Sequence, residues 1–237
     1  MESHMKILII TGASRGIGHA TCQRFQEDGW RIYNLSRTPC PLADVENIAV
    51  DLTDPVELDR CAAPLLATWK QAKRIAVVHN ASSYHSDTVE TVNLPALMTA
   101  FQLNVGAAVA LNQMVLPFMP RGSSILYIGS TLSEQGSPGS ATYIMLKHAV
   151  VGLMRATCQD LAGRGIHTAC ICPGFTDTEM LRSRMGPDPA VRASVEARMS
   201  AGRLLAPREI AELLFFSANN PALDGSVLHA NLGQLRH

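Results

Sequence analysis

The feature that most constrains this chain is a glycine-rich turn close to its start. The apolar run Ile7–Ile10 is typical of a buried strand, and residues 11–18 then read Thr-Gly-Ala-Ser-Arg-Gly-Ile-Gly. Gly12 suits a tight turn at positive φ, Gly16 lets the backbone approach phosphate oxygens, and Gly18 lets a helix pack close to the strand. The free N–H groups at the start of that helix, and the positive end of its dipole, would then face an anion.

This order of strand, glycine turn and helix predicts a site for the pyrophosphate of a dinucleotide cofactor. The alternative is an ordinary strand-to-helix turn, since glycines are common in turns of every kind. The spacing is G-x-x-x-G-x-G rather than G-x-G-x-x-G, so the general rule applies but the family of that fingerprint does not.

Short apolar runs alternate along the chain with segments of helical pattern. We expect strands at Ile7–Ile10, Arg31–Leu35, Ile48–Val50, Ile75–His79, Ser124–Gly129, His167–Cys172 and Val227–Ala230. We expect helices at Ile17–Asp28, Pro55–Trp69, Pro95–Phe118, Ala141–Arg164 and Pro207–Ala218. Strands separated by helices predict an α/β chain: a single-domain Rossmann fold with a doubly wound, mostly parallel seven-stranded sheet and helices on both faces.

That single domain should cover residues 5–237. Residues 1–4 precede a second methionine and match no structural pattern, as expected of a tag remnant. Residues 176–205 are the one long stretch outside the alternating pattern, and they contain two prolines and several arginines. We expect them to form a substrate lid, with a solvated connection as the alternative.

The composition limits the kinds of molecule that the protein is expected to bind. Twenty basic and twenty acidic residues leave no net charge, so nothing in the bulk composition recruits nucleic acid or an anionic membrane. We find no signal peptide and no apolar stretch of about 18 residues, and we therefore expect a cytoplasmic protein that does not span a membrane and acts on a small molecule. The six cysteines form no C-x-x-C pair and should be free, mostly buried thiols. No histidine has a partner at metal-ligand spacing, and no metal site is predicted.

Two polar residues on one predicted helix suggest chemistry. Tyr143 and Lys147 are four residues apart, so their side chains share a face and the ammonium can stabilise a phenolate. Such pairs also occur by chance, but Ser130 follows the strand Ser124–Gly129. In a doubly wound sheet the carboxyl ends of the strands line the ligand crevice, so Ser130 and the glycine turn should open into one cleft.

With Asn80-Ala81, Asn104 and Pro173-Gly174 in the same order, these motifs resemble the short-chain dehydrogenase/reductase family, from Lys6 to about Gly225. The resemblance implies a catalytic tetrad of Asn104, Ser130, Tyr143 and Lys147.

In that tetrad Tyr143 would donate the proton, with a pKa that the Lys147 ammonium lowers, and Lys147 would also bind the nicotinamide ribose. Ser130 would hold the substrate oxygen, with a strand-end serine that caps a turn as the alternative. Asn104 would kink its helix and position a relay water, with a solvent-facing asparagine as the alternative.

The resemblance also implies a set of cofactor-binding residues. Asp51 would bind the adenine amino group, Asn80 would steady the central strand, and Thr178 would contact the nicotinamide carboxamide. The full set is Gly12, Ser14, Arg15, Gly16, Ile17, Gly18, Ser36, Arg37, Asp51, Leu52, Asn80, Ala81, Tyr143, Lys147, Pro173, Gly174, Phe175, Thr176 and Thr178.

The chain departs from the family pattern at three places. Ser82 stands where the family has glycine, so the turn after that strand is expected to take a different path. Ile144, Met145 and Leu146 separate the catalytic pair where small residues are usual, and Asn231-Leu232-Gly233 replaces the usual ending.

The choice of coenzyme follows from the end of the second expected strand. NAD-binding sheets place an acidic residue there for the ribose 2′-hydroxyl, but this chain has Ser36-Arg37. A guanidinium can pair a 2′-phosphate, and Arg15 in the glycine turn is a second basic residue. The prediction is NADP(H), although either arginine alone could be a solvated surface charge.

These observations predict an NADP(H)-dependent oxidoreductase that interconverts a ketone or aldehyde and an alcohol. The alternatives are a β-ketoacyl-thioester (acyl carrier protein) reductase, suggested by arginines in residues 176–205, and a cofactor sensor without turnover. A homodimer or homotetramer is expected because two helices carry more apolar surface than one sheet face covers: Met114, Val115, Ile144, Met145, Val150, Val151 and Met154.

Overall fold

The computed structural model describes residues 5–234 as one seven-stranded sheet, and the expected tag remnant at residues 1–4 lies outside them. The strand order is β3-β2-β1-β4-β5-β6-β7, and every pair is parallel. The predicted doubly wound Rossmann fold is confirmed. The strands are β1 (Lys6–Thr11), β2 (Arg31–Leu35), β3 (Val45–Ile48), β4 (Arg74–His79), β5 (Ser124–Ile128), β6 (His167–Pro173) and β7 (Ser226–Ala230).

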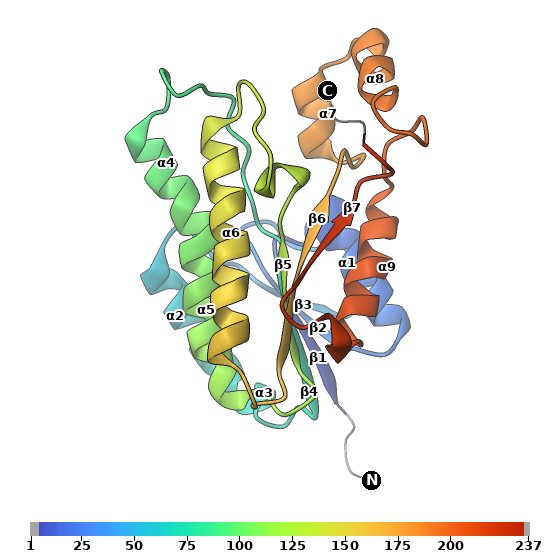
Figure 1. The fold of residues 1–237 in the computed structure, drawn as a ribbon. Helices are drawn as coiled ribbons and strands as arrows, with labels where there is room; N and C mark the ends of the chain where they lie inside the picture. Colours follow the sequence, from blue (N-terminus) through green and yellow to red (C-terminus); the bar gives the residue numbers. More distant parts are fainter. Residues whose placement is uncertain (1–4, 235–237) are drawn as a thin grey trace.

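Helices cover both faces of the sheet (Figure 1). Side chains of β1 alternate between the two faces, because successive residues of a strand point in opposite directions. Ile7 and Ile9 belong to the core under α5 and α6, whereas Leu8 and Ile10 belong to the core under α1 and α9. The helices are α1 (Gly16–Glu27), α2 (Pro55–Ala62), α3 (Leu66–Trp69), α4 (Leu94–Phe101), α5 (Ala107–Val115), α6 (Ala141–Asp160), α7 (Glu179–Met185), α8 (Pro189–Glu196) and α9 (Pro207–Ala218).

Four predicted elements differ from the observed ones by more than one residue or are divided into parts. The third strand lies at Val45–Ile48 rather than Ile48–Val50, and the Asn47 side chain ties it to the backbone N–H and carbonyl of Cys40. The helix predicted over Pro55–Trp69 is interrupted by a 3₁₀ turn that contains Pro64, because proline lacks the N–H that a continuous helix needs. The helix predicted to end at Arg164 ends at Asp160.

The helix predicted over Pro95–Phe118 begins one residue earlier and has four parts. Asn93 caps its start, since its side chain accepts a hydrogen bond from the N–H of Ala96. Residues Gln102–Gly106 between α4 and α5 form a π-helical turn, and a 3₁₀ turn over Leu116–Phe118 ends the run. A π turn bends a helix and is frequent at functional sites.

This run also corrects the expectation that the chain has no apolar stretch of membrane-spanning length. By length and composition alone, Leu94–Phe118 is long and apolar enough to cross a membrane. One such helix is weak support for a membrane protein, because core helices of globular domains pass the same test. Here Leu111 and Val115 are buried against the sheet.

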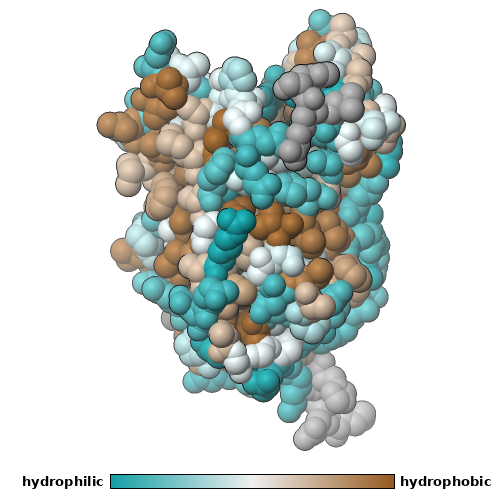
Figure 2. Space-filling model, viewed as in Figure 1, coloured by the Kyte–Doolittle hydropathy of each residue, from teal (hydrophilic) through white to brown (hydrophobic). Residues whose placement is uncertain are grey.

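The expected apolar face is only partly external. Val115, Val150, Val151 and Met154 point toward the sheet and are buried in the chain's own core, so the prediction that they form external surface is wrong. Met145 is exposed, and α4 adds three exposed apolar side chains: Leu94, Met98 and Phe101. Figure 2 shows hydrophobic side chains gathered over α4.

A buried polar chain ties the middle of the sheet to the helices over it. His79 Nε2 lies 2.8 Å from Asn112 Oδ1, and Asn112 Nδ2 donates to the hydroxyl of Tyr127, which lies 3.0 Å from Thr157 Oγ1. Because the Asn112 oxygen faces the ring, His79 Nε2 carries the proton and donates it. Burial lowers the pKa of His79 to about 4.

We predict a pH-dependent contribution of His79 to stability. A histidine in the unfolded chain titrates near 6.5, so the unfolded state binds more protons, and stability falls as the pH decreases from about 6.5 toward about 4. The loss attributable to this residue should be roughly 3 kcal/mol. Urea unfolding of the wild type and of His79→Gln near neutral and near pH 4 measures it. If both proteins lose the same free energy over that interval, His79 does not carry the effect.

Candidate active site

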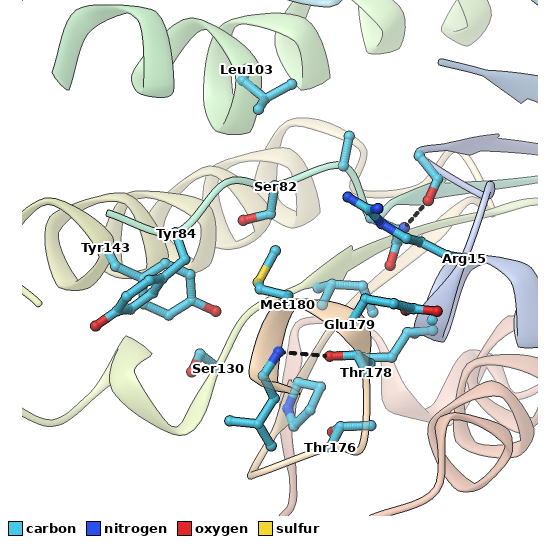
Figure 3. A pocket seen from close by; sticks show the side chains of 18 of the residues that line it. Arg15, Ser82, Tyr84, Leu103, Ser130, Tyr143, Thr176, Thr178, Glu179 and Met180 are labelled. Atoms are coloured by element: carbon cyan, nitrogen blue, oxygen red, sulfur yellow. Dashed lines mark hydrogen bonds between the residues drawn. The ribbon is translucent and has the colours of Figure 1, made fainter. Parts of the chain in front are cut away.

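One cavity of about 580 Å³ opens at the carboxyl edge of the sheet. Its walls come from the segments that follow β1 to β6 and from α6 and α7, so residues far apart in sequence meet there. Figure 3 shows Tyr84 and Tyr143 side by side at one end and Arg15 at the other. The structure brings together all the predicted site residues except Gly18 and Asn104, which do not line the cavity.

The glycine turn has the close packing that its sequence predicts. Gly12 and Gly16 adopt positive φ angles of 70° and 57°. A Cβ on Gly18 would lie 2.5 Å from the carbonyl oxygen of Gly12 and 2.6 Å from Asn80 Nδ2, so no larger residue fits there. Gly18 therefore acts by letting α1 pack under the turn.

The start of α1 is suited to an anion. Arg15 is the N-cap residue, and its side chain accepts no hydrogen bond from the helix, nor does the first turn contain an acidic residue. Helix N–H groups without a side-chain cap need another acceptor. Since Arg15, Gly16 and Ile17 line the cavity, these donors and the basic side chain fit the pyrophosphate of a dinucleotide.

Asn80 holds the turn in place from the neighbouring strand. Its Nδ2 donates to the carbonyls of Thr11 and Gly12, at 3.0 and 2.8 Å, and Thr11 Oγ1 accepts from the N–H groups of Asn80 and Ala81. From the other side, Asn34 Oδ1 accepts from the N–H of Ala13 at 3.0 Å. Both neighbours of β1 thus fix the backbone of the turn.

The far end of the cavity carries the groups expected to select the coenzyme. Arg37 follows β2 with 75% of its side chain exposed, and its Nη1 lies 3.9 Å from Asp51 Oδ2. The hydroxyl of Ser36 accepts from Asn34 Nδ2 and donates to the carbonyl of Thr38, so it helps to shape the loop. The Asp51 carboxylate accepts from Thr53, which lowers the pKa of Asp51.

Ser130, Tyr143 and Lys147 line the opposite end together. Ser130 Oγ accepts from the N–H of Leu132 at 3.1 Å and caps the 3₁₀ turn Thr131–Ser133, so the turn-capping alternative is correct. This capping role does not exclude the catalytic role of Ser130, because its hydroxyl hydrogen stays available to a substrate oxygen. Lys147 is buried, and its Nζ donates to the carbonyl of Ile128 at 2.9 Å.

The electrostatics of Tyr143 differ from the expectation. Burial raises the pKa of Tyr143, while the Ser130 hydroxyl and the positive charge of Arg184 oppose that rise. The expected lowering by Lys147 is not seen: its Nζ lies 5.5 Å from the ring centroid and is bound to Ile128. Burial also lowers the pKa of Lys147 to about 8. Near neutral pH Tyr143 is therefore a neutral phenol and Lys147 is an ammonium cation, so the phenol can donate its proton to a carbonyl.

Asn104 lies behind the cavity wall inside the π turn and is buried, so the solvent-facing alternative is wrong. Its Nδ2 donates to the carbonyl of Ala100, and its Oδ1 accepts from Ser82 Oγ, both at 2.8 Å. Ser82, the residue that departs from the family glycine, therefore supplies the partner of the Asn104 side chain.

The end of β6 and the segment after it form a part of the cavity wall that reaches the glycine turn. Pro173, Gly174, Phe175, Thr176 and Thr178 all line it. Thr178 caps α7, with its Oγ1 accepting from the N–H of Leu181, and its methyl group would lie 3.1 Å from a Cβ on Gly16.

Sequence reasoning missed several residues of the cavity wall. Tyr84 comes from the loop after β4, and Leu103 comes from the π turn Gln102–Gly106. Leu132 lies in the turn that Ser130 caps, and Met180 and Arg184 come from α7. Apart from Met180, which ends the segment that begins at Pro173-Gly174, no motif marks these positions. The one available signal was the expected lid, which pointed to residues 176–205 without identifying the side chains that face inward.

Comparison with known proteins is consistent with this geometry. Residues 12–234 match the family described as "Enoyl-(Acyl carrier protein) reductase". The chain belongs to the short-chain dehydrogenase/reductase family. Its members are oxidoreductases that use a nicotinamide cofactor, and the uncapped helix and glycine turn of this chain fit that group.

Individual short-chain dehydrogenase/reductase relatives match over almost the whole chain. Protein FixR of Bradyrhizobium diazoefficiens is 33% identical over 97% of this chain and 86% of its own length. The 3-oxoacyl-[acyl-carrier-protein] reductase FabG of Escherichia coli is 27% identical over 98% of both chains.

Solved structures of the family share the fold. Ligand-free aldohexose dehydrogenase (AldT) of Thermoplasma acidophilum superposes with a TM-score of 0.89 at 24% identity, covering 97% of this chain and 94% of its own. A short-chain dehydrogenase/reductase of Serratia marcescens gives 0.84 at 26% identity, covering 98% and 99%.

Proposed function

We propose that this protein is an NADP(H)-dependent oxidoreductase that interconverts a small ketone or aldehyde and its alcohol. The observation that carries the proposal is that the uncapped start of α1 and the side chains of Ser130, Tyr143 and Lys147 line opposite ends of the same cavity. A bound nicotinamide ring would supply the hydride.

The chain's own residues would supply the proton and the orientation. Ser130 would donate a hydrogen bond to the carbonyl oxygen, where negative charge develops during reduction. Tyr143, kept protonated by burial, would give its proton to that oxygen. The Ser130 hydroxyl and the Arg184 charge would stabilise the resulting phenolate. Lys147 would hold the ribose, and Asn104 would maintain the π turn beside them.

The main alternative is reduction of a β-ketoacyl thioester on an acyl carrier protein. The similarity to FabG favours it, and arginines of residues 176–205 were expected to meet the acidic carrier. However, Arg182 pairs with Asp177, Arg192 with Asp177 and Glu196, and Arg203 with Glu209. Three of these arginines therefore already have acidic partners within the chain. A cofactor sensor is a weaker alternative, because a sensor has no use for a proton donor beside the cofactor.

Several further expectations remain proposals. We propose that the protein has no nucleic acid or membrane partner, on the basis of its balanced charge, and its cytoplasmic location is likewise a proposal. We also propose that residues 176–205, which contain α7 and α8, act as the substrate lid. Glu179, Met180, Leu181 and Arg184 of α7 line the cavity, which supports that role.

The first test of the function concerns the proton donor. Tyr143→Phe removes one hydroxyl and should leave folding and NADPH binding unchanged, while kcat falls by about 10²–10⁴-fold, as expected for a lost general acid. NADPH oxidation with a panel of ketones and aldehydes measures the rate, and fluorescence titration measures binding. A variant that keeps more than about a tenth of the wild-type rate excludes Tyr143 as the donor.

The second test concerns the coenzyme. Ser36→Asp combined with Arg37→Leu should move the preference toward NADH, because a carboxylate repels the 2′-phosphate and the guanidinium partner is lost. The change should appear mainly in KM for NADPH, since the phosphate is remote from the hydride. A wild-type enzyme with a higher kcat/KM for NADH than for NADPH would show that the interpretation of Arg15 and Arg37 is wrong.

The third test concerns assembly. We propose a homodimer or homotetramer that buries the exposed apolar side chains of α4 and Met145 of α6. Light scattering should report a dimer or tetramer at micromolar concentration, and Met98→Lys combined with Met145→Lys should weaken it. A monomeric wild type at that concentration contradicts the proposal.

A further inference from the structure

Arg184 of α7 places a positive charge next to the catalytic tyrosine. It lines the cavity, and its guanidinium carbon lies 4.4 Å from the centroid of the Tyr84 ring. The Tyr84 ring is in turn 5.2 Å from the ring of Tyr143, at an interplanar angle of 58°. Figure 3 shows the two tyrosine rings side by side. Arg184, Tyr84 and Tyr143 thus form a continuous row of side chains from α7 to Tyr143, called the stack below, in which the two tyrosine rings are tilted.

The middle of this stack is held rigidly. The hydroxyl of Tyr84 is 2.9 Å from Ser140 Oγ and 3.2 Å from the carbonyl oxygen of Gly139, immediately before α6. Stacking covers one face of the guanidinium but leaves the N–H groups at its edge free to bind an anion. The charge acts at the reacting group, since Arg184 opposes the rise in the pKa of Tyr143.

Arg184 also differs from three of the four other arginines of residues 176–205. Arg182, Arg192 and Arg203 each pair with an acidic residue of the chain. Within residues 5–234, the side chain of Arg184 makes neither an ion pair nor a hydrogen bond. The Arg198 side chain also lacks both, but it lies over the Phe175 ring and does not line the cavity. Glu179 is an acidic residue of α7 that also lines the cavity. It lies at the opposite end of α7 from Arg184, and its Oε2 would be 3.8 Å from a Cβ on Gly16.

We propose that Arg184 binds an anionic group of the substrate, so that the substrate is a small carbonyl compound that also carries a carboxylate or phosphate. This inference rests on the proposed oxidoreductase function and names the substrate class of that site. The stack places the guanidinium within about 10 Å of the Tyr143 ring, so a few bonded atoms separate the carbonyl from the anion. The phosphate of a phosphopantetheine thioester is a whole pantetheine chain away from its β-carbonyl, too far for this contact.

The test compares matched charged and neutral substrates on the full-length protein with NADPH. The probes are aldehyde and keto carboxylates of increasing chain length and a keto phosphate, each beside its methyl ester or dephosphorylated form. For at least one pair, the wild type should show a higher kcat/KM for the anion. Arg184→Met should lower the ratio of anionic to neutral kcat/KM by about 10-fold or more, mainly through KM for the anion. Arg184→Lys should recover part of the loss.

Arg182→Met is the matched control, because it makes the same chemical change two residues away on the same helix at a side chain that pairs with Asp177. It should leave the ratio of anionic to neutral kcat/KM unchanged. Equal kcat/KM for the members of every pair, or an unchanged ratio in Arg184→Met, overturns the proposal and leaves the oxidoreductase function standing.

A binding measurement tests the anion site separately from the oxidoreductase function. Calorimetric titration of the keto carboxylates and the keto phosphate into NADPH-saturated Tyr143→Phe follows binding without turnover. Binding that disappears when Arg184→Met is added supports the anion site even if no probe is reduced by the wild type. Equal binding by both proteins, or no binding of any anion, overturns it. Absence of NADPH oxidation with every probe counts separately, against the oxidoreductase function.

Discussion

The site depends on one steric constraint, the absence of a side chain at Gly18. Any Cβ there would lie within 2.6 Å of the Gly12 carbonyl and of the Asn80 amide, and α1 would have to move away from β1. The start of α1 would then leave the cavity and take its free N–H groups with it. Asn80 and Asn34 stabilise the same arrangement from the two neighbouring strands. The phosphate-binding end is therefore a consequence of how three parallel strands and one helix pack.

The catalytic end depends on burial. Lys147 reaches the carbonyl of Ile128 at the end of β5, and Ser130, two residues later, caps the turn that leads away from the strand. Burial moves the two pKa values in opposite directions, up for Tyr143 and down for Lys147. Both shifts have the same physical cause, because a buried site disfavours the charged form of each group. The result is a protonated phenol close to a lysine that still carries its proton near neutral pH, which is the state that carbonyl reduction needs.

Sequence reasoning found the parts of the molecule that depend on local rules. The glycine turn, the alternation of strands and helices, and the residues at strand ends all follow from backbone geometry, and the observed sheet agrees with them. Sequence reasoning failed where tertiary contacts determine the burial of a side chain or its pKa. Val150 and Met154 look like external surface on a helix considered alone, but they pack against the sheet. The pKa of Tyr143 reflects its whole surroundings, whereas the spacing to Lys147 describes only one neighbour. Arg184 and Tyr84 meet across the cavity, and no motif joins them.

The central claim is that the cavity is a site of hydride transfer. The most direct measurement supplies NADPH deuterated at the transferred position of the nicotinamide and follows the label by mass spectrometry of the product. If hydride transfer occurs there, one deuterium appears on the carbinol carbon of the alcohol formed from an anionic carbonyl substrate, and Tyr143→Phe abolishes most of this product. NADPH binding without labelled alcohol from any carbonyl compound, or product that lacks the label, would contradict it.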